Sequence, residues 1–159
     1  MTNYSPGIQN NEKLKEFIVK FYKASDKAPR SDEQHDPYLD FFTTNSPLVM
    51  GLKKVKGHQE IAQLRQGMWE KVTHRHHVVN NVAEINEKEI LLNGYVEYTL
   101  INGKNVTTEW AGHMKLENST GDENGYKMNY YQVYLDPSAA AKALIELIVT
   151  RKLFPIMIS

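Results

Sequence analysis

Cysteine is absent from the 159-residue sequence. This absence excludes disulfide bonds, catalysis by a thiolate and metal sites built on sulfur ligands. An excess of either charge is absent too, because 19 Lys and Arg residues balance 19 Asp and Glu residues. A nucleic-acid-binding surface would need clustered positive charge, so we expect no nucleic-acid partner.

The sequence also lacks a hydrophobic run of the kind that spans a membrane. Its most apolar stretch, ALIELIVTRKLFPIMIS, is too short and is interrupted by Glu146, Arg151 and Lys152. We expect this stretch to pack against the domain or against a partner subunit. The opening residues, MTNYSPGIQNNEK, have neither the basic nor the apolar region of a secretory signal. We therefore expect a cytoplasmic protein with no membrane partner.

Three segments in the first half have the patterns of helices. In residues 12–26, apolar side chains recur at spacings of three and four, which is typical of one face of an amphipathic helix. Asp36 and Pro37 suit an N-cap and a first helical position, so they predict a second, short helix. Gly57 precedes a third helix in HQEIAQLRQGMWEKV. Between the last two, NSPLVMGL predicts a short strand and the run KKVK a solvated loop.

The second half is rich in β-formers. Four such segments are separated by turn residues and cover residues 74–85, 89–101, 105–117 and 126–136. The strongest hairpin signal is INGK, because Asn-Gly accepts the positive φ angles of a type I′ turn. Consecutive hairpins predict an antiparallel meander, and a last helix is predicted over residues 138–153.

Together these elements predict one α+β domain over residues 1–159, in which N-terminal helices pack on one face of a curved antiparallel sheet. The core of this domain is expected over about residues 12–137, and residues 138–159 are expected to form a C-terminal helix and an apolar tail.

The order of these elements resembles a known fold. The segments that support the resemblance are KGHQEI, which opens a helix, the hairpin GYVEYTLINGK, the strand TEWAGHMKLE and the closing KMNYYQVYLD. Roughly residues 14–137 resemble the cone-shaped nuclear transport factor 2 fold and its SnoaL-like group. The resemblance implies a deep pocket between the helices and the concave face of the sheet, and often a dimer formed through the sheet. Members include polyketide cyclases, ketosteroid isomerase, limonene epoxide hydrolase and scytalone dehydratase, along with proteins that have no catalytic role. The fold therefore does not fix the function.

Three of the six histidines lie within four positions, in THRHHVV. Strand alternation places His74 and His76 on one face and His77 on the other, but it does not say which face looks into the cone. An H-x-H pair can present two imidazoles to one metal ion. A third ligand would have to come from a neighbouring strand, where the candidates are Glu97, Glu109 and His113. We predict no metal and no cofactor; a polar role at the strand end or at a dimer surface is the main alternative for the histidines.

Scytalone dehydratase resembles this chain in having an acidic residue at the end of the first helix and a histidine on the strand after the third helix. Asp26 lies at the matching helix end, and His74 or His76 lies near the matching strand position. The resemblance thus implies acid–base catalysis by Asp26 with His74 or His76. If the other face of the strand looks inward, His77 takes their place.

Other positions depart from the catalytic patterns of these relatives. Ser25 and Met50 stand where scytalone dehydratase has tyrosines, and Gln132 or Val133 stands where SnoaL-like cyclases have an acid on the last strand. The resemblance therefore does not imply either of these specific activities.

Aromatic residues predict the walls of the pocket. Tyrosine suits a packed sheet face, a dimer surface or hydrogen bonding to a ligand, and tryptophan suits either core or a wall against which a ring lies. On the third long strand, the even-numbered positions are expected to face the pocket. The predicted substrate-binding residues are Tyr22, Tyr38, Trp69, His77, Tyr98, Trp110, Met114 and Tyr131.

The sequence thus favours a small-molecule pocket protein that acts as a cofactor-independent isomerase, cyclase or dehydratase-type lyase on an apolar substrate of polyketide or terpenoid type. The competing interpretation is a non-catalytic ligand-binding or dimerisation module of the same fold, and the sequence leaves open whether the protein is an enzyme. The expected partners are a small organic ligand and a second copy of the chain.

Overall fold

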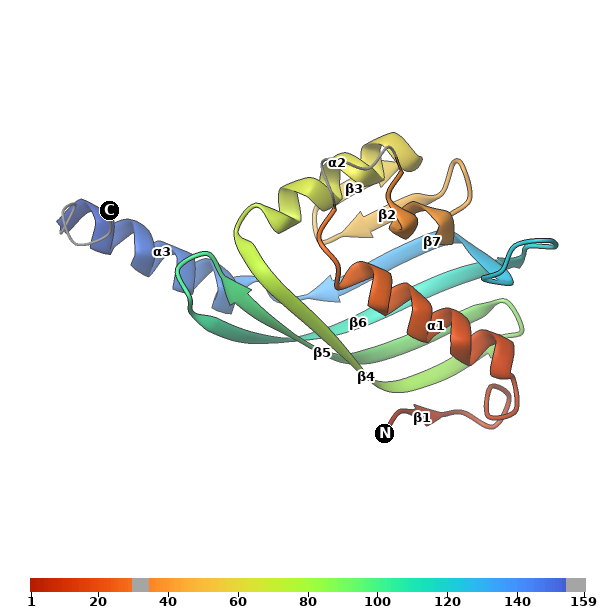
Figure 1. Cartoon of the computed structure of the whole chain (residues 1–159). Helices are drawn as coiled ribbons and strands as arrows, with labels where there is room; N and C mark the ends of the chain where they lie inside the picture. Colours follow the sequence, from red (N-terminus) through yellow and green to blue (C-terminus); the bar gives the residue numbers. More distant parts are fainter. Residues whose placement is uncertain (30–34, 154–159) are drawn as a thin grey trace.

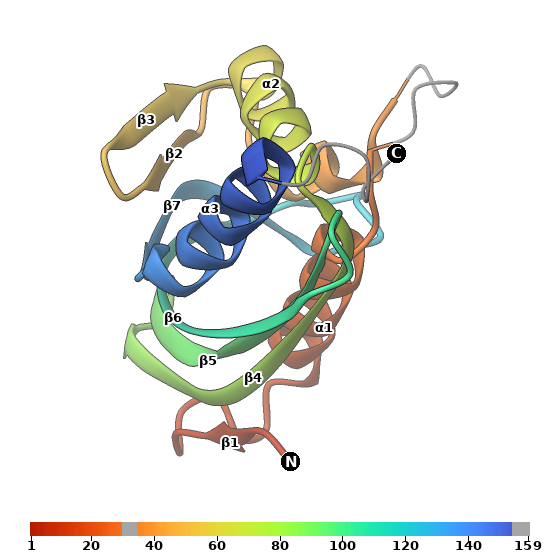
Figure 2. The ribbon, with the colours of Figure 1, turned by 90° about the vertical axis from the view of Figure 1, so that its left-hand side faces the viewer.

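The computed structural model describes residues 1–29 and 35–153, with side chains described up to residue 145. Its strands form one curved sheet in the order β1-β4-β5-β6-β7-β2-β3. The strands are β1 (Asn3–Tyr4), β2 (Pro47–Met50), β3 (Lys53–Lys56), β4 (Val72–Asn86), β5 (Glu89–Leu100), β6 (Asn105–Asn118) and β7 (Tyr126–Leu135). The helices are α1 (Glu12–Ser25), the 3-10 helix η1 (Pro37–Phe41), α2 (His58–Trp69) and α3 (Ser138–Leu153). The sheet bends so that α1 and α2 lie on its concave side (Figure 1; Figure 2).

Strands β4 to β7 form the antiparallel meander that the sequence predicts. The predicted α+β class, with helices on a curved sheet, is confirmed. The sheet as a whole is mixed, because β1 lies parallel to β4 and β2 lies parallel to β7. The run KKVK was predicted as a solvated loop, and this is wrong: it is strand β3, which pairs with β2. Its exposed lysines lie at an edge of the sheet, where charge discourages pairing with other chains.

Helix α1 is positioned by its caps and by its apolar face. The Asn11 side chain accepts a hydrogen bond of 3.1 Å from the backbone N–H of Leu14, and Asp26 is the C-cap residue. The predicted apolar stripe is buried and consists of Leu14, Phe17, Ile18, Phe21 and Tyr22. Because this face is buried against the sheet, the end of the helix, and with it Asp26, is held at a defined place.

The second predicted helix is present as the 3-10 helix η1. Asp36 caps it as expected, accepting a hydrogen bond of 3.1 Å from the backbone N–H of Tyr38, and Pro37 takes the first position. Gly57 precedes α2 with a φ of 86°, a backbone conformation that favours glycine. Helix α2 ends at Trp69, before the predicted end of this segment at Val72.

Strand β4 is irregular where it passes the centre of β5. The register shifts between Val79 and Asn81, so β4 carries an extra residue there. Such a bulge bends the strand and changes which residues face inward. Gly94 of β5 pairs with Val79, and a Cβ at Gly94 would lie 1.8 Å from the carbonyl oxygen of Val78. Only glycine allows the two strands to approach this closely.

The β5–β6 hairpin forms at INGK, but its turn is not the predicted type I′. That turn needs a positive φ at both central residues. Gly103 has a φ of 82°, whereas among the described residues only glycines have positive φ, so Asn102 does not meet the requirement. The Asn102 side chain instead donates a hydrogen bond of 3.3 Å to the carbonyl oxygen of Ala143 in α3. A contact with a distant helix thus contributes to the turn conformation.

Helix α3 has the predicted bounds and extends beyond the end of the sheet, next to the β5–β6 turn (Figure 1). The predicted packing of the apolar tail FPIMIS concerns residues 154–159, which lie outside the described residues. Within the described part of the chain, no helix has the length and apolar character needed to cross a membrane.

Candidate active site at the end of helix α1

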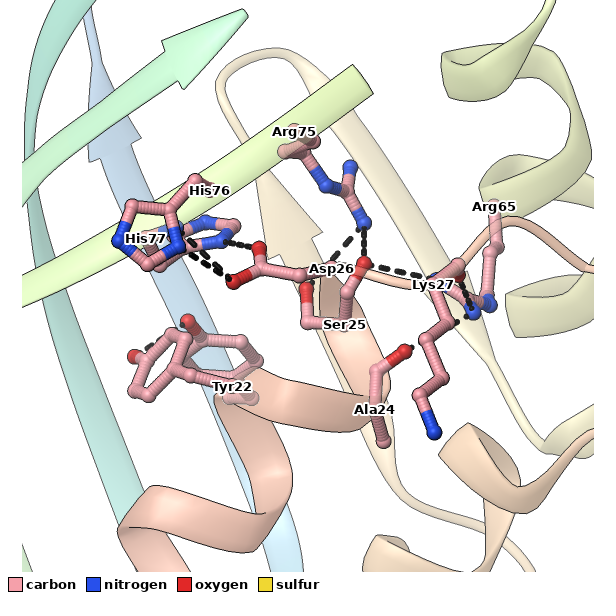
Figure 3. Close-up of polar contacts among 10 residues, drawn as sticks. Tyr22, Ala24, Ser25, Asp26, Lys27, Arg65, Arg75, His76 and His77 are labelled. Carbon is pink, nitrogen blue, oxygen red and sulfur yellow. Dashed lines mark hydrogen bonds and ion pairs between the residues drawn. The ribbon is translucent and has the colours of Figure 1, made fainter. Parts of the chain in front are cut away.

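The C-terminal end of α1 meets β4 and brings Asp26 and His77 together (Figure 3). Asp26 Oδ1 lies 2.5 Å from His77 Nδ1, and Asp26 Oδ2 accepts a hydrogen bond of 3.0 Å from the backbone N–H of His77. Both side chains are largely buried, with exposed fractions of 17% for Asp26 and 13% for His77. The packing of α1 on β4 therefore creates a histidine–carboxylate pair from residues far apart in the sequence.

The hydrogen bond between Nδ1 and Asp26 assigns the roles of the His77 ring nitrogens. An ionised carboxylate only accepts hydrogen bonds, so the imidazole donates its Nδ1–H to Asp26. In the neutral ring, the lone pair then lies on Nε2. A carboxylate that orients an imidazole through Nδ1 leaves Nε2 ready to accept a proton.

The surroundings of His77 keep its ring neutral. Burial lowers the pKa of His77 below its ordinary value of 6.5, and the charge of Arg75 lowers it further. The hydrogen bond and the charge of Asp26 act in the opposite direction, but burial is the larger effect. At neutral pH the site therefore contains an unprotonated imidazole, the form that a general base requires.

Aromatic side chains enclose the pair. The Tyr22 ring centroid lies 5.1 Å from that of His77 and 5.0 Å from that of Trp110. The hydroxyls of Tyr22 and Tyr131 are 2.9 Å apart and share a buried hydrogen bond. Burial raises the pKa of Tyr38 to about 12 and also raises the pKa values of Tyr22, Tyr98 and Tyr131. These phenols remain protonated at neutral pH and can donate hydrogen bonds.

A cavity of about 40 Å³ lies inside the cone beside His77. Its walls combine polar and apolar side chains: Ser25, Tyr38, Met50, Met68, Arg75, His77, Val96, Tyr98, Trp110, Tyr131, Val133 and Leu135. The volume is enough for only one or two water molecules. Most of the deep pocket that the resemblance implies is thus filled by side chains. Methionine rearranges easily, so Met50 and Met68 are the wall residues best able to move for a larger ligand.

A groove of about 500 Å³ lies on the other side of the pair, between α1 and β4. Asp26, His74, His76 and His77 all contribute to its lining. Since His77 lines the groove as well as the cavity, it lies between the two spaces.

Two buried arginines also bind the end of α1. Arg65 of α2 is 1% exposed and pairs with Asp36, with Nε 2.6 Å from Oδ2. Its guanidinium also donates to the backbone carbonyls of Ala24, Ser25 and Lys27. A cation at a helix C-terminus is favourable because the last carbonyls have no partners within the helix.

Arg75 of β4 is 6% exposed and donates to the backbone carbonyl and the hydroxyl of Ser25 (Figure 3). The planar guanidinium lies over the Trp69 ring, with a distance of 4.7 Å from Cζ to the ring centroid. Neither arginine is among the site residues predicted from the sequence. The signals were present, since Arg65 occupies the apolar face of its helix beside Ile61 and Leu64, and Arg75 alternates with the histidines.

The structure also resolves which face of β4 looks inward. Arg75 and His77 line the cavity, whereas His74 is exposed and the His76 side chain is 55% exposed. His76 Nδ1 still lies 3.8 Å from Asp26 Oδ2. The catalytic role predicted for His74 and His76 stays a prediction, and the geometry favours the alternative in which His77 takes it.

The predicted substrate-binding residues divide into two groups. The cavity brings together Tyr38, His77, Tyr98, Trp110 and Tyr131. Tyr22 does not line it but contacts His77, Trp110 and Tyr131. Met114 is fully buried in the hydrophobic core and does not line the cavity. Trp69 contacts the site only through its stacking on Arg75.

The candidate ligands for a metal do not converge. Within the described residues, no group of three histidine, aspartate or glutamate side chains could hold a metal ion. His113 instead lies 2.7 Å from Glu89, and Glu97 and Glu109 are exposed.

Solved structures show which fold this is. The chain is similar to an NTF2-like protein from Burkholderia pseudomallei, with 13% identity over 82% of this chain and 95% of that one and a TM-score of 0.61. A putative SnoaL-like polyketide cyclase from Jannaschia sp. CCS1 is 13% identical over 83% and 91% of the two chains, with a TM-score of 0.63. TerC, co-crystallised with polyporic acid, is 15% identical over 82% and 96%, with a TM-score of 0.63.

No family model and no curated protein matches the sequence. At these identities the similarity shows the fold alone. The predicted cone-shaped NTF2-like fold is confirmed, and its function has to be argued from the site.

Proposed function

We propose that the protein binds a small, largely apolar organic molecule in its cone and acts on it as a cofactor-independent acid–base enzyme. The observation that carries this proposal is the 2.5 Å contact between His77 Nδ1 and Asp26 Oδ1 at the wall of an aromatic cavity. A histidine that is oriented by a carboxylate at a cavity wall and has a lowered pKa is a candidate catalytic group.

In the proposed reaction, His77 Nε2 removes a proton from a carbon next to a substrate carbonyl. The electron pair of the C–H bond forms the C=C bond of an enolate, the π pair of the carbonyl moves to its oxygen, and Asp26 stabilises the imidazolium that forms. The hydroxyls of Tyr38 and Tyr98 line the same cavity and can donate to the developing negative oxygen. Returning the proton to another carbon of the delocalised enolate completes an isomerisation. In a cyclisation, the enolate carbon attacks a second carbonyl of the substrate, and the proton goes to the alkoxide that forms. In a dehydration, the enolate re-forms its carbonyl, the bond to a β-hydroxyl breaks, and that hydroxyl takes the proton and leaves as water.

The expected substrate is a polyketide- or terpenoid-like molecule. Its apolar body suits the aromatic walls, and its oxygens suit the inward phenols. The solved structures with this fold support a small-molecule ligand, because one is named a putative polyketide cyclase and another was co-crystallised with polyporic acid.

We further propose that the protein is a cytoplasmic homodimer that associates through the convex face of the sheet. Leu91 and Tyr134 are exposed on this face and border a groove of about 390 Å³. Exposed apolar residues around a groove favour contact with another protein surface. Size-exclusion chromatography with light scattering should report a dimer, and a monomer at micromolar concentration would contradict this part of the proposal.

A non-catalytic binding module is the second candidate, and one observation favours it. The cavity of about 40 Å³ admits no polyketide-sized molecule unless its walls move. In that case Asp26 and His77 would serve to join α1 to β4, and the protein would bind ligands without turning them over.

Hydrogen–deuterium exchange separates the two candidates without knowledge of the natural reaction. A panel of cyclic ketones and β-diketones is incubated with the protein in deuterated water, and exchange of protons next to the carbonyl is followed by NMR. The enzyme should accelerate exchange for at least one member of the panel. His77→Gln should abolish the acceleration, whereas the matched variant His74→Gln on the outer face should retain it. No acceleration over buffer across the panel, or equal acceleration by the His77→Gln variant, would rule out His77 as the base.

A further inference from the structure

The geometry of the cone points to an anionic ligand. We propose that the bound molecule carries a charged oxygen, such as a carboxylate or an ionised enol, which accepts hydrogen bonds from Arg75 Nε and Trp110 Nε1. This inference rests on the proposed function, because it names the substrate class of the same site.

The first observation is a buried cation that forms no ion pair with the described residues. Arg75 is 6% exposed, and among the residues that the structure describes no carboxylate oxygen lies within 4.0 Å of its guanidinium nitrogens. Its hydrogen-bond partners are the carbonyl and hydroxyl of Ser25, which are neutral groups. Burial lowers the pKa of Arg75, and the charge of Asp26 acts to raise this pKa without forming an ion pair. A buried charge is costly unless it is paired, so an anion entering this site would relieve an existing cost.

The second observation is a pair of buried donors without acceptors. Arg75 Nε and Trp110 Nε1 are both shielded from solvent and have no hydrogen-bond partner among the described residues. Both residues line the cavity of about 40 Å³. Buried polar groups are normally satisfied, so two orphaned donors at one cavity indicate that a ligand supplies the acceptor.

Arg65 is a second buried arginine, and it differs from Arg75 because every nitrogen of its guanidinium has a hydrogen-bond partner. It binds the same end of α1, but its Nε is paired with Asp36 at 2.6 Å and its other nitrogens donate to backbone carbonyls. It also stacks on an aromatic ring, with Cζ 4.4 Å from the centroid of Tyr38. Arg75 shares the stacking and the contact with the helix end, and differs in its free Nε and in lining the cavity.

A water molecule in the cavity could also accept both hydrogen bonds, but it would leave the guanidinium charge unpaired. An anionic oxygen satisfies the donors and the charge together, and such charge-assisted bonds are roughly twice as strong as neutral ones. The walls next to Arg75 are the phenols of Tyr38 and Tyr98 and the ring of His77. These groups suit a flat organic anion whose reactive carbon lies near His77 Nε2.

The test uses two pairs of probes that differ in charge but little in shape, namely formate with formamide and benzoate with benzamide. Formate is small enough for the cavity as it stands, and benzoate requires the walls to move. Binding is followed by NMR of the Nε–H signals of Arg75 and Arg65 and the indole N–H signal of Trp110, at about pH 8, where His77 is neutral. Arg65 is the internal control because its Nε already has a partner.

At least one carboxylate should shift the Arg75 and Trp110 signals, leave Arg65 unchanged and bind at least about tenfold more tightly than its amide. Arg75→Met should remove the preference for the carboxylate, and Arg75→Lys should retain part of it. Equal binding of acid and amide, shifts confined to other residues, or no shift with either carboxylate would overturn the proposal. The wild-type measurement alone is decisive if the variants fail to fold.

The outcomes keep this inference apart from the proposed function. If the His77→Gln variant no longer accelerates proton exchange but carboxylates do not shift the Arg75 signal, the proposed anion site is contradicted and the catalytic role of His77 is supported. If carboxylates bind at Arg75 but His77→Gln exchanges protons normally, the anion site stands and the catalytic role is wrong.

Discussion

The two faces of strand β4 carry similar residues, but these residues differ in burial and in hydrogen bonding. On the inner face, Arg75 and His77 are largely buried, and each is hydrogen-bonded to the end of α1. On the outer face, His74 is exposed and His76 is more than half exposed. Three histidines of one short segment thus have unlike environments, and only His77 has both a fixed tautomer and a burial that keeps it neutral. The difference shows that residue type and spacing do not define an acid–base group until the packing is known.

The largest effect is expected from Asp26→Asn. The amide of asparagine can turn its NH2 group towards His77 Nδ1, which would make Nδ1 the acceptor and place the proton on Nε2. The base would then be blocked, and turnover should fall by about 10³- to 10⁴-fold, as when the carboxylate of a catalytic triad is replaced in the same way. Nitrogen-15 NMR of the His77 ring measures the tautomer directly. Unchanged turnover with a switched tautomer would show that the inner face is not catalytic.

A smaller effect is expected on stability when the Asp26 carboxylate is removed altogether. Asp26→Ala leaves the backbone N–H and the Nδ1–H of His77 without their acceptor in a largely buried place. Leaving such donors unsatisfied should lower the free energy of unfolding by about 1–3 kcal/mol. Urea denaturation of this variant and of Asp26→Asn measures the loss, and the asparagine variant should lose less because it retains one acceptor. Equal losses would indicate that the hydrogen bonds are not what holds the two elements together.

The inner face should also give stability a pH dependence. The pKa of His77 lies below 6.5 in the folded protein because of burial, whereas the unfolded chain has the ordinary value. As the pH falls through about 6.5, the unfolded state takes up the proton first, so the contribution of His77 to stability, fully present above that pH, is progressively lost. Activity should also decrease as the pH is lowered, because the protonated ring cannot act as a base.

Urea midpoints measured at about pH 8 and about pH 5.5 check this, with His77→Gln as the variant that should reduce the difference. His74→Gln is the matched control and should retain the wild-type difference. If the urea midpoint of the His77→Gln variant decreases more between these two pH values than that of the wild type, another group is responsible for the pH dependence.

The smallest effects are expected on the outer face. His74→Ala and His76→Ala should each change the free energy of unfolding by no more than about 0.5 kcal/mol, as is usual for exposed positions. Turnover should stay close to that of the wild type, with the larger change at His76, whose Nδ1 lies 3.8 Å from Asp26. A loss of turnover in the His76→Ala variant as large as that in Asp26→Asn would restore the catalytic role predicted for His74 and His76 and break the contrast between the faces.

Local patterns predicted most of the fold. The apolar stripe of α1, the Asp36-Pro37 cap of η1 and the four β-rich segments are all found where the sequence places them. The errors arose where a distant partner decided the outcome. KKVK forms a strand because it pairs with the free edge of β2. The INGK turn is not of type I′, and the Asn102 side chain donates a hydrogen bond to α3.

The candidate site was less predictable than the fold. Asp26 could be singled out because a helix end is visible in the sequence, and most of the predicted aromatic residues do surround the cavity. The inward face of β4 could not be determined, because polar residues occupy both faces and the bulge after Val79 interrupts the alternation. Arg65 and Arg75 were missed because most of their hydrogen bonds go to backbone carbonyls at the end of α1, and the sequence does not show which side chain will reach those carbonyls.

The sequence by itself determined the helices, the meander and the aromatic character of the interior, since these depend on periodicity and on residue types that act over a few positions. Only the tertiary structure decided that His77 rather than His74 or His76 forms hydrogen bonds with Asp26, that the cone is nearly filled and that Arg75 Nε has no hydrogen-bond partner among the described residues. The physical reason is that hydrogen bonding, burial and charge pairing depend on which surfaces the packing of α1 against β4 brings into contact, and that contact joins residues distant along the chain.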